Sequence, residues 1–303
     1  MAKKVFISYS QKQADWVRET LYPVLAAGGA EIVIDYREFA AGIAVRKQMS
    51  AAQGRAEVHL LVFTPDYLAS SFCREEMQRA LALDPGFENG AVLPIVLETC
   101  DLPAEINAAE PLHVDLRGDR QENADAWRLV MERCEADLGT SVPNWVASFR
   151  RMTGALRRNK SVNLLIRGLP RWRAFLDQVK LAFPAMGIVD LESGRTVARR
   201  GLVAEILRAV ANYPGPIPAE DDLAELERVL ESQPPSILVL KHFEKAPERL
   251  YGNDLYSSLR YLIMEKRLLT LVVQSRAPFA SLLPNGHLLS YLEMETVELG
   301  GIH

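Results

Sequence analysis

The side chains best suited to chemistry in the first half of this 303-residue chain are a thiol and two adjacent carboxylates, at Cys73, Glu75 and Glu76. A nucleophilic cysteine needs a histidine base that a third group orients. None of the five histidines forms a Cys/His/Asp pattern with Cys73, so this thiol is expected to pack in the core or against a site wall. A carboxylate, in contrast, can act alone by stabilising positive charge in a substrate. Glu75 and Glu76 point about 100° apart on a helix, so they face different surroundings.

Alternating strands and helices must position these glutamates. The expected strands of the first half are Val5–Ser8, Glu31–Ile34, Val58–Phe63 and Val92–Leu97. The expected helices are Ala14–Leu25, one near Val45–Gln53, Ser70–Leu83 and Trp127–Leu138. This alternation predicts an α/β domain with a parallel sheet covered by helices on both faces. Ligands bind such sheets at the carboxyl ends of the strands, which here are Tyr9-Ser10, Asp35–Gly42 and Thr64-Pro65.

A second α/β domain is expected in the second half, where the alternation repeats. Its expected strands are Val162–Ile166, Gly187–Leu191, Ser236–Leu240, Leu269–Gln274 and Glu293–Leu299. Its expected helices lie near Trp172–Ala182, Gly201–Ala211, Ala219–Glu231, Asp254–Met264 and Pro278–Leu283. We therefore predict a first domain at residues 1–140, a basic linker at 141–160 and a second domain at 161–303.

Three segments of the first domain carry a family resemblance. They are Val5-Phe-Ile-Ser-Tyr-Ser10, Ile32-Val-Ile-Asp-Tyr-Arg-Glu-Phe-Ala-Ala-Gly42 and Phe63-Thr-Pro-Asp-Tyr-Leu-Ala-Ser-Ser-Phe-Cys-Arg-Glu-Glu-Met77. In this order they resemble the first strand, the second strand with its BB loop, and the S-P-x-Y-x-x-S-x-W-C-x-x-E stretch of Toll/interleukin-1 receptor (TIR) domains. The resemblance implies a flavodoxin-like fold.

The resemblance also implies a choice of function. Some TIR domains only bind other TIR domains, whereas others cleave NAD+ between nicotinamide and ribose. In the enzymes the glutamate of the W-C-x-x-E stretch is catalytic, and it corresponds here to Glu76. NAD+ would then be the substrate, and no cofactor is expected. The implied substrate-binding residues are Tyr9, Ser10, Asp35, Phe39, Gly42, Phe72 and Cys73. Phe72 stands where tryptophan is common in the family; it can stack but has no indole N–H.

One carboxylate is sufficient for this reaction. Cleavage of the bond between ribose and nicotinamide develops oxocarbenium character on the ribose, as in glycoside cleavage. Nicotinamide leaves as a neutral molecule, so no general acid is needed, and a carboxylate can stabilise the transition state electrostatically. The alternative for Glu76 is a solvated helix face paired with Arg74 or Arg79. For Tyr9 and Ser10 it is turn chemistry, for the BB loop an ordinary loop, and for Asp35 capping of backbone amides.

The second domain resembles an AAA-like P-loop NTPase that has lost its phosphate site. The segment Ile166-Arg-Gly-Leu-Pro-Arg-Trp-Arg173 follows the first strand, where the family has G-x-x-x-x-G-K-[ST]. Phosphate binding there needs glycine-permitted backbone amides, a lysine and a hydroxyl, and only Gly168 is present. The strand Ser236–Leu240 is followed by Lys241 and His242 rather than by an acidic magnesium ligand. We therefore expect a sensing or oligomerising domain, not ATP hydrolysis.

Charge and composition limit the classes of partner that the chain can have. Residues 1–140 carry 22 acids and 14 bases, and residues 141–303 carry 17 acids and 21 bases. Eight bases and no acid lie between Arg150 and Arg173, as a solvated face or an anion-binding surface. No apolar run approaches the ~18–20 residues of a membrane span, and no signal-peptide core follows Met1. The odd number of cysteines, Cys73, Cys100 and Cys134, without metal-ligand spacing, predicts neither disulfides nor a zinc site and fits a cytoplasmic protein.

The leading hypothesis is an NAD+-cleaving TIR protein of the bacterial type. The resemblance implies activation by self-association through TIR domains, an unknown ligand or protein acting on the second domain, and a role in antiphage defence by NAD+ depletion. The alternative is a non-enzymatic adaptor that binds other TIR domains through its BB loop. A third hypothesis makes residues 150–173 a nucleic-acid contact, which the scarcity of aromatic residues there disfavours. The product, the trigger and the oligomeric state are left open.

Overall fold

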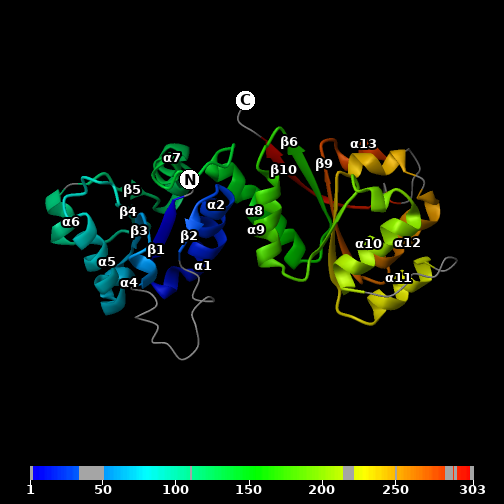
Figure 1. Cartoon of the computed structure of the whole chain (residues 1–303), viewed down its shortest axis with the longest axis horizontal. Coiled ribbons are helices and arrows are strands. Elements are labelled where there is room, and N and C mark those ends of the chain that lie inside the picture. The colour runs from blue at the N-terminus through cyan, green and yellow to red at the C-terminus, as the bar shows by residue number, and fades with distance from the viewer. Residues whose placement is uncertain are drawn as a thin grey trace. The chain divides into compact units, whose positions relative to one another are not determined.

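The computed structural model describes residues 3–33, 51–109, 111–213, 222–249, 251–283, 289 and 292–300. The chain divides into two units, of which unit 1 comprises Met1–Val146 with Arg173–Gln178 and unit 2 comprises Ala147–Trp172 with Val179–Gly301. Each unit contains one five-stranded sheet, and all described strand pairs are parallel (Figure 1). The prediction of two α/β domains with parallel sheets is confirmed.

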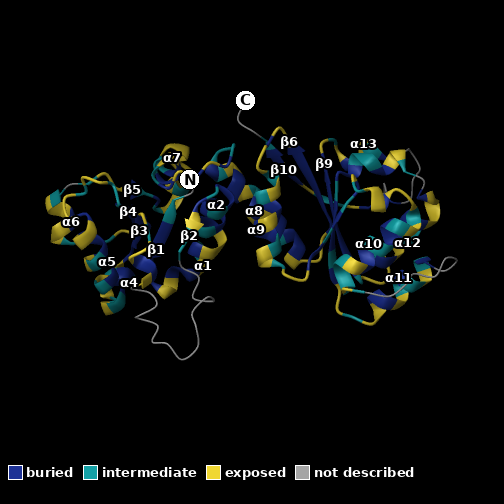
Figure 2. Ribbon diagram, viewed as in Figure 1, coloured by how far each residue is buried: buried dark blue, intermediate teal, exposed yellow. Residues whose placement is uncertain are grey.

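The sheet of unit 1 has the strand order β2-β1-β3-β4-β5. These strands are β1 (Lys4–Ser8), β2 (Glu31–Ile32), β3 (Val58–Phe63), β4 (Val92–Val96) and β5 (Val114–Asp115). Every residue of β3 and β4 is buried, as expected of central parallel strands with both faces covered (Figure 2). In the register of β1 and β3, Ser8 lies opposite Leu61.

The helices of unit 1 largely follow the predicted ones. They are α1 (Ala14–Trp16), α2 (Tyr22–Ala27), α4 (Pro65–Ala69), α5 (Ser71–Leu83), α6 (Ala104–Ala109) and α7 (Ala124–Arg133). A π-helical turn, Val17–Leu21, joins α1 to α2. Gly28 is the C-cap of α2, and a Cβ on Gly28 would approach Ala136 Cβ and Met131 Cε at 2.9 Å. Glycine there allows the α2 end to pack closely on the segment after α7.

The sheet of unit 2 has the strand order β10-β6-β9-β8-β7. Its strands are β6 (Val162–Arg167), β7 (Gly187–Asp190), β8 (Ser236–Lys241), β9 (Leu269–Ser275) and β10 (Glu295–Gly300). Its helices are α9 (Trp172–Ala182, shared with unit 1), α10 (Arg199–Ala211), α11 (Asp222–Glu231), α12 (Gly252–Met264) and α13 (Phe279–Leu282). A continuous apolar core lies between β7, β8 and β9 and the helices α10, α11 and α12. Gly187 lets α10 approach β7, because a Cβ there would lie 2.8 Å from the Ala209 carbonyl oxygen.

Two segments differ from the prediction. Most of the expected basic linker is a helix, α8 (Val142–Arg157), because Trp145, Phe149 and Met152 recur at helical spacing and are buried. The helix expected to reach Leu138 ends at Arg133, since Glu135 adopts a left-handed backbone conformation with φ 50°. Of the helix expected near residues 45–53, only residues 51–53 are described, and they are helical. No helix in the described part of the chain has both the length and the apolar character that crossing a bilayer demands.

Candidate active site

Glu76 lies on the buried face of α5. The Ser70 hydroxyl caps this helix by accepting a hydrogen bond from the Cys73 amide at 3.3 Å. The buried residues of the helix follow the 3.6-residue period, and they are Cys73, Glu76, Met77, Ala80 and Leu81. Glu76 is therefore the one carboxylate in an apolar stripe, and it is 2% exposed. The alternative of a solvated helix face is excluded for this residue.

One hydroxyl group binds an oxygen of the Glu76 carboxylate, and a second hydroxyl group holds the first. Ser8, the last residue of β1, donates its hydroxyl to Glu76 Oε2 at 2.5 Å. The hydroxyl of Tyr67 on α4 lies 2.9 Å from the same Ser8 oxygen. Because Ser8 has a single hydroxyl hydrogen, which goes to the carboxylate, Tyr67 is the donor in this second bond. The three side chains form a buried chain of hydrogen bonds that runs from Tyr67 through Ser8 to Glu76.

The other oxygen of this carboxylate, Glu76 Oε1, is buried and has no hydrogen-bond partner among the residues that the structure describes. Burial raises the pKa of the Glu76 carboxyl to about 7, against the opposing effects of the Ser8 hydrogen bond and the positive charge of Arg79. The carboxyl group therefore changes its charge near neutral pH. A buried, unpaired acceptor is rare in a folded protein, and at a sheet edge it marks a place where a substrate group can bind.

The backbone at Glu76 is held from a second side. Gln53, which is 2% exposed, donates its side-chain amide to the Glu76 carbonyl oxygen at 2.7 Å. The Gln53 carbonyl in turn accepts a hydrogen bond from Arg79 Nε at 2.8 Å. Arg79 is about one turn after Glu76, so Gln53 bonds two successive turns of α5. These bonds fix the position of Glu76 along the helix relative to the segment that precedes β3.

A second polar group occupies the carboxyl ends of the strands. The Thr64 hydroxyl donates to Gln13 Oε1 at 3.2 Å, and Gln13 Nε2 donates to Glu98 Oε1 at 3.1 Å. The same Thr64 oxygen caps α4 by accepting from the Tyr67 amide at 3.1 Å. Polar side chains thus follow β1, β3 and β4 at the edge of the sheet where ligands bind in α/β folds.

The predicted substrate-binding residues have different surroundings. Cys73 is buried, donates weakly to the Tyr9 carbonyl oxygen at 3.6 Å, and has its pKa raised by burial, so it is a thiol and not a nucleophile at neutral pH. Ser10 accepts a hydrogen bond from the Lys12 amide at 3.4 Å, which is the turn role considered as its alternative. Tyr9 and Phe72 are partly exposed. Asp35, Phe39 and Gly42 lie outside the described residues.

Sequence reasoning missed three residues of this group. Ser8 and Tyr67 both lie inside the segments that carried the family resemblance, so their position there was an available signal. Gln53 had no such signal, because its contact with Glu76 spans 23 residues and depends on the tertiary fold.

The comparison with known families concerns unit 1. Residues 5–130 match the family model described as the TIR domain. Over these residues the chain is similar to TIR domains. The match includes β1 with Ser8, α4 with Tyr67 and α5 with Glu76. The TIR family includes enzymes that cleave NAD+. The match covers residues 5–130 and does not extend into the rest of the chain.

Three solved structures resemble parts of the chain. The TIR domain of the Toll-related receptor TRR-2 from Hydra magnipapillata is 21% identical over 43% of this chain and 97% of its own, with a TM-score of 0.38. The Walker-type ATPase PABY2304 of Pyrococcus abyssi is 13% identical over 51% of this chain and 52% of its own, with a TM-score of 0.38. Drosophila ORC bound to AT-rich DNA and Cdc6 is 12% identical over 66% and 61%, with a TM-score of 0.36. A search of curated proteins gave no match.

Proposed function

We propose that the TIR domain is an NAD+ glycohydrolase with Glu76 as its catalytic residue. The observation that carries the proposal is the buried carboxylate whose Oε2 is fixed by Ser8 while Oε1 is left without a partner in the described part of the chain. A carboxylate fixed by one oxygen presents the other in a constant direction. Such a group, already oriented before substrate arrives, stabilises developing positive charge without reorganisation.

The proposed reaction breaks the bond between the nicotinamide nitrogen and C1′ of the ribose. The bonding electron pair leaves with nicotinamide, which becomes neutral, and the ribose acquires oxocarbenium character. Ionised Glu76 stabilises this charge or holds a ribose hydroxyl through Oε1. Water then adds to C1′ and loses a proton, which gives ADP-ribose; attack by a group of the substrate itself gives a cyclic product.

The charge state of Glu76 makes this proposal sensitive to pH. With a pKa of about 7, the carboxyl is mostly protonated at pH 6 and mostly ionised at pH 8. Only the ionised form stabilises an oxocarbenium ion, so turnover is expected to rise with pH across this range. A glutamate with an ordinary pKa would give a flat profile there.

Substrate contacts and activation are part of the same proposal. Tyr9, which follows β1, and Phe72, in the first turn of α5, are partly exposed and are proposed to contact the substrate. The resemblance adds Asp35, Phe39 and Gly42. We further propose that TIR domains self-associate to become active, that unit 2 receives the activating ligand or protein, and that the cell uses the resulting NAD+ loss for antiphage defence.

The test is nicotinamide release from NAD+ by the purified full-length chain, at low and high protein concentration. Glu76→Ala and Glu76→Gln are compared with Glu75→Ala, the matched control one residue away on a different face of α5. We expect release that rises faster than linearly with protein concentration and is lost in both Glu76 variants only. Turnover that survives in Glu76→Gln, or is lost equally in Glu75→Ala, would contradict the proposal. TIR–TIR binding without any turnover would support the adaptor alternative.

A further inference from the structure

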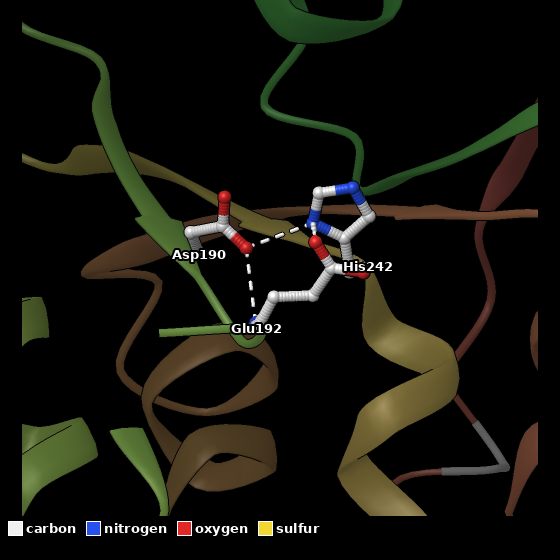
Figure 3. A group of neighbouring side chains, drawn as sticks. All are labelled: Asp190, Glu192 and His242. Atoms are coloured by element: carbon white, nitrogen blue, oxygen red, sulfur yellow. Dashed lines mark hydrogen bonds and ion pairs between the residues drawn. The ribbon is translucent and has the colours of Figure 1, made fainter. Parts of the chain in front are cut away.

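Three possible metal ligands meet at the carboxyl edge of the unit 2 sheet. Asp190 ends β7, Glu192 lies two residues further on, and His242 directly follows β8. The strands β7 and β8 are parallel neighbours, with Asp190 opposite Lys241 in the register, so these residues reach the same edge. One ligand atom of each side chain lies within 4.8 Å of the others. Figure 3 shows Asp190 and Glu192 turned toward the imidazole ring.

His242 is held in a fixed orientation. Its side chain is 6% exposed, and its ring packs edge-on against Trp172, with 5.5 Å between ring centroids. Its backbone lies in the left-handed region at φ 55°, and its amide donates to Gln274 Oε1 at 2.9 Å. The Nδ1 atom consequently faces the two carboxylates, at 2.8 Å from Asp190 Oδ1 and 3.6 Å from Glu192 Oε2.

The charged groups around the His242 ring are negative in sum and therefore favour a cation. Asp190 Oδ1 faces His242 Nδ1 and the Glu192 amide, and both lie within hydrogen-bond distance. Lys241 Nζ lies 3.0 Å from the other oxygen, Asp190 Oδ2. Two carboxylates and one ammonium therefore give this group a net charge of about −1 when the imidazole is neutral. Oδ1 accepts the Glu192 amide at 3.0 Å, and its second lone pair faces His242 Nδ1 at 2.8 Å, where the ion would replace the shared proton.

We propose that Asp190, Glu192 and His242 bind a divalent transition-metal ion of the zinc class, with water completing the coordination. One imidazole nitrogen with two carboxylate oxygens is a donor set that suits Zn²⁺, whereas Mg²⁺ and Ca²⁺ prefer oxygen alone. Bonds of about 2.0–2.1 Å in a tetrahedron separate the ligand atoms by about 3.3 Å. The distances of 2.8 and 3.6 Å lie on either side of this value. The ion takes the place of the proton between Nδ1 and Oδ1, and the imidazole proton moves to Nε2.

The sequence did not predict this site because Asp190 and His242 are 52 residues apart and belong to different strands. Its alternative is a purely structural hydrogen bond from His242 to Asp190 that supports the left-handed turn after β8. Glu192 separates the two interpretations. Its side chain is 53% exposed, so a structural hydrogen bond does not need it, whereas a metal site does.

The experiment measures Zn²⁺ binding by the full-length chain after chelator treatment, by titration calorimetry and by the melting temperature of unit 2. We expect one equivalent of ZnCl₂ to bind and to raise the melting temperature by about 2–5 °C, while MgCl₂ gives no shift. Glu192→Gln should weaken Zn²⁺ binding at least about 10-fold and keep the fold. The matched control is Glu248→Gln, because Glu248 is also exposed and pairs with Lys245 instead.

His242→Gln removes the nitrogen ligand and should abolish binding. If this variant unfolds, Asp190→Asn and Glu192→Gln still provide the comparison. Unchanged Zn²⁺ affinity in Glu192→Gln, equal losses in Glu248→Gln, or the absence of any Zn²⁺ binding would overturn the proposal. An equal response to MgCl₂ would overturn the assignment to the zinc class. None of these readouts depends on NAD+ cleavage, so this proposal and the proposed function can fail separately.

Discussion

Ser8→Ala tests whether the hydroxyl at the end of β1 controls the charge of Glu76. The substitution removes the hydrogen bond of 2.5 Å to Glu76 Oε2 and leaves the buried Tyr67 hydroxyl without its acceptor. A hydrogen bond to a charged group is worth about 1.5–3 kcal/mol, and 1.36 kcal/mol corresponds to about one pKa unit. The pKa of Glu76, which is about 7 in the wild type, should therefore rise by about 1–2 units.

The size of the effect on activity follows from this shift. With a pKa of about 7, half of the Glu76 carboxyls are ionised at pH 7. An increase of one unit leaves about a tenth ionised, so nicotinamide release at pH 7 should fall about fivefold. At pH 9 most of this loss should disappear, because the carboxyl is ionised again. The assay is the rate of nicotinamide release between pH 5.5 and pH 9.5.

Ser10→Ala is the matched control, since Ser10 is also a buried serine after β1 but its hydroxyl accepts from the Lys12 amide. Its pH profile should keep the wild-type midpoint. A lower rate in Ser8→Ala at every pH, without displacement of the midpoint, would refute the reasoning and give Ser8 a structural role only. Circular dichroism at each pH separates either result from loss of the fold.

Three further predictions follow. Burial raises the Glu76 pKa from 4.5 to about 7, so the folded state binds the proton more tightly and wild-type stability falls as pH rises through this window. Denaturant titrations should therefore show the stability of Glu76→Gln rising by about 3 kcal/mol relative to wild type between pH 4.5 and 7. A stability difference that stays constant with pH would contradict this. Iodoacetamide should modify the partly exposed Cys100 before Cys73 and Cys134, as peptide mass spectrometry can show; equal rates would contradict their burial. Arg199→Met should destabilise unit 2 by about 3 kcal/mol in thermal unfolding, because Asp222, 2% exposed, loses the cation 3.1 Å away; an unchanged melting temperature would contradict this.

The predicted elements were most accurate where short-range patterns decide the structure. The apolar runs Val58–Phe63 and Leu269–Gln274 are buried central strands, as expected, and Ser70 caps the helix that carries Glu76. The pattern failed at α8, where arginines that follow the buried aromatic residues suggested a linker. A helix that buries one stripe tolerates many charges on the rest of its surface, so composition alone misclassified this segment.

The site was only partly predictable because its geometry depends on tertiary contacts. A family motif singled out Glu76 as the candidate, and the structure shows this side chain buried on α5. The orientation of its carboxylate, however, depends on Ser8, 68 residues away, and on the coincidence that β1 ends beside α5. Its raised pKa likewise comes from surrounding apolar residues that no local pattern specifies. Distant partners of this kind must be read from the fold.

Both units place polar groups at the carboxyl edge of a parallel sheet, but the groups suit different ligands. In unit 1 a single carboxylate is buried with one oxygen unpaired among the described residues, an arrangement suited to a substrate that becomes positively charged. In unit 2 the loop after β6 offers Gly168 at φ 66° as its one glycine, and β8 is followed by Lys241 and His242. Neither feature cradles a triphosphate, because successive backbone amides, a loop lysine and a magnesium ligand are not brought together there. A nitrogen ligand beside two carboxylates is instead a place for a metal ion, so we expect unit 2 to respond to a divalent cation.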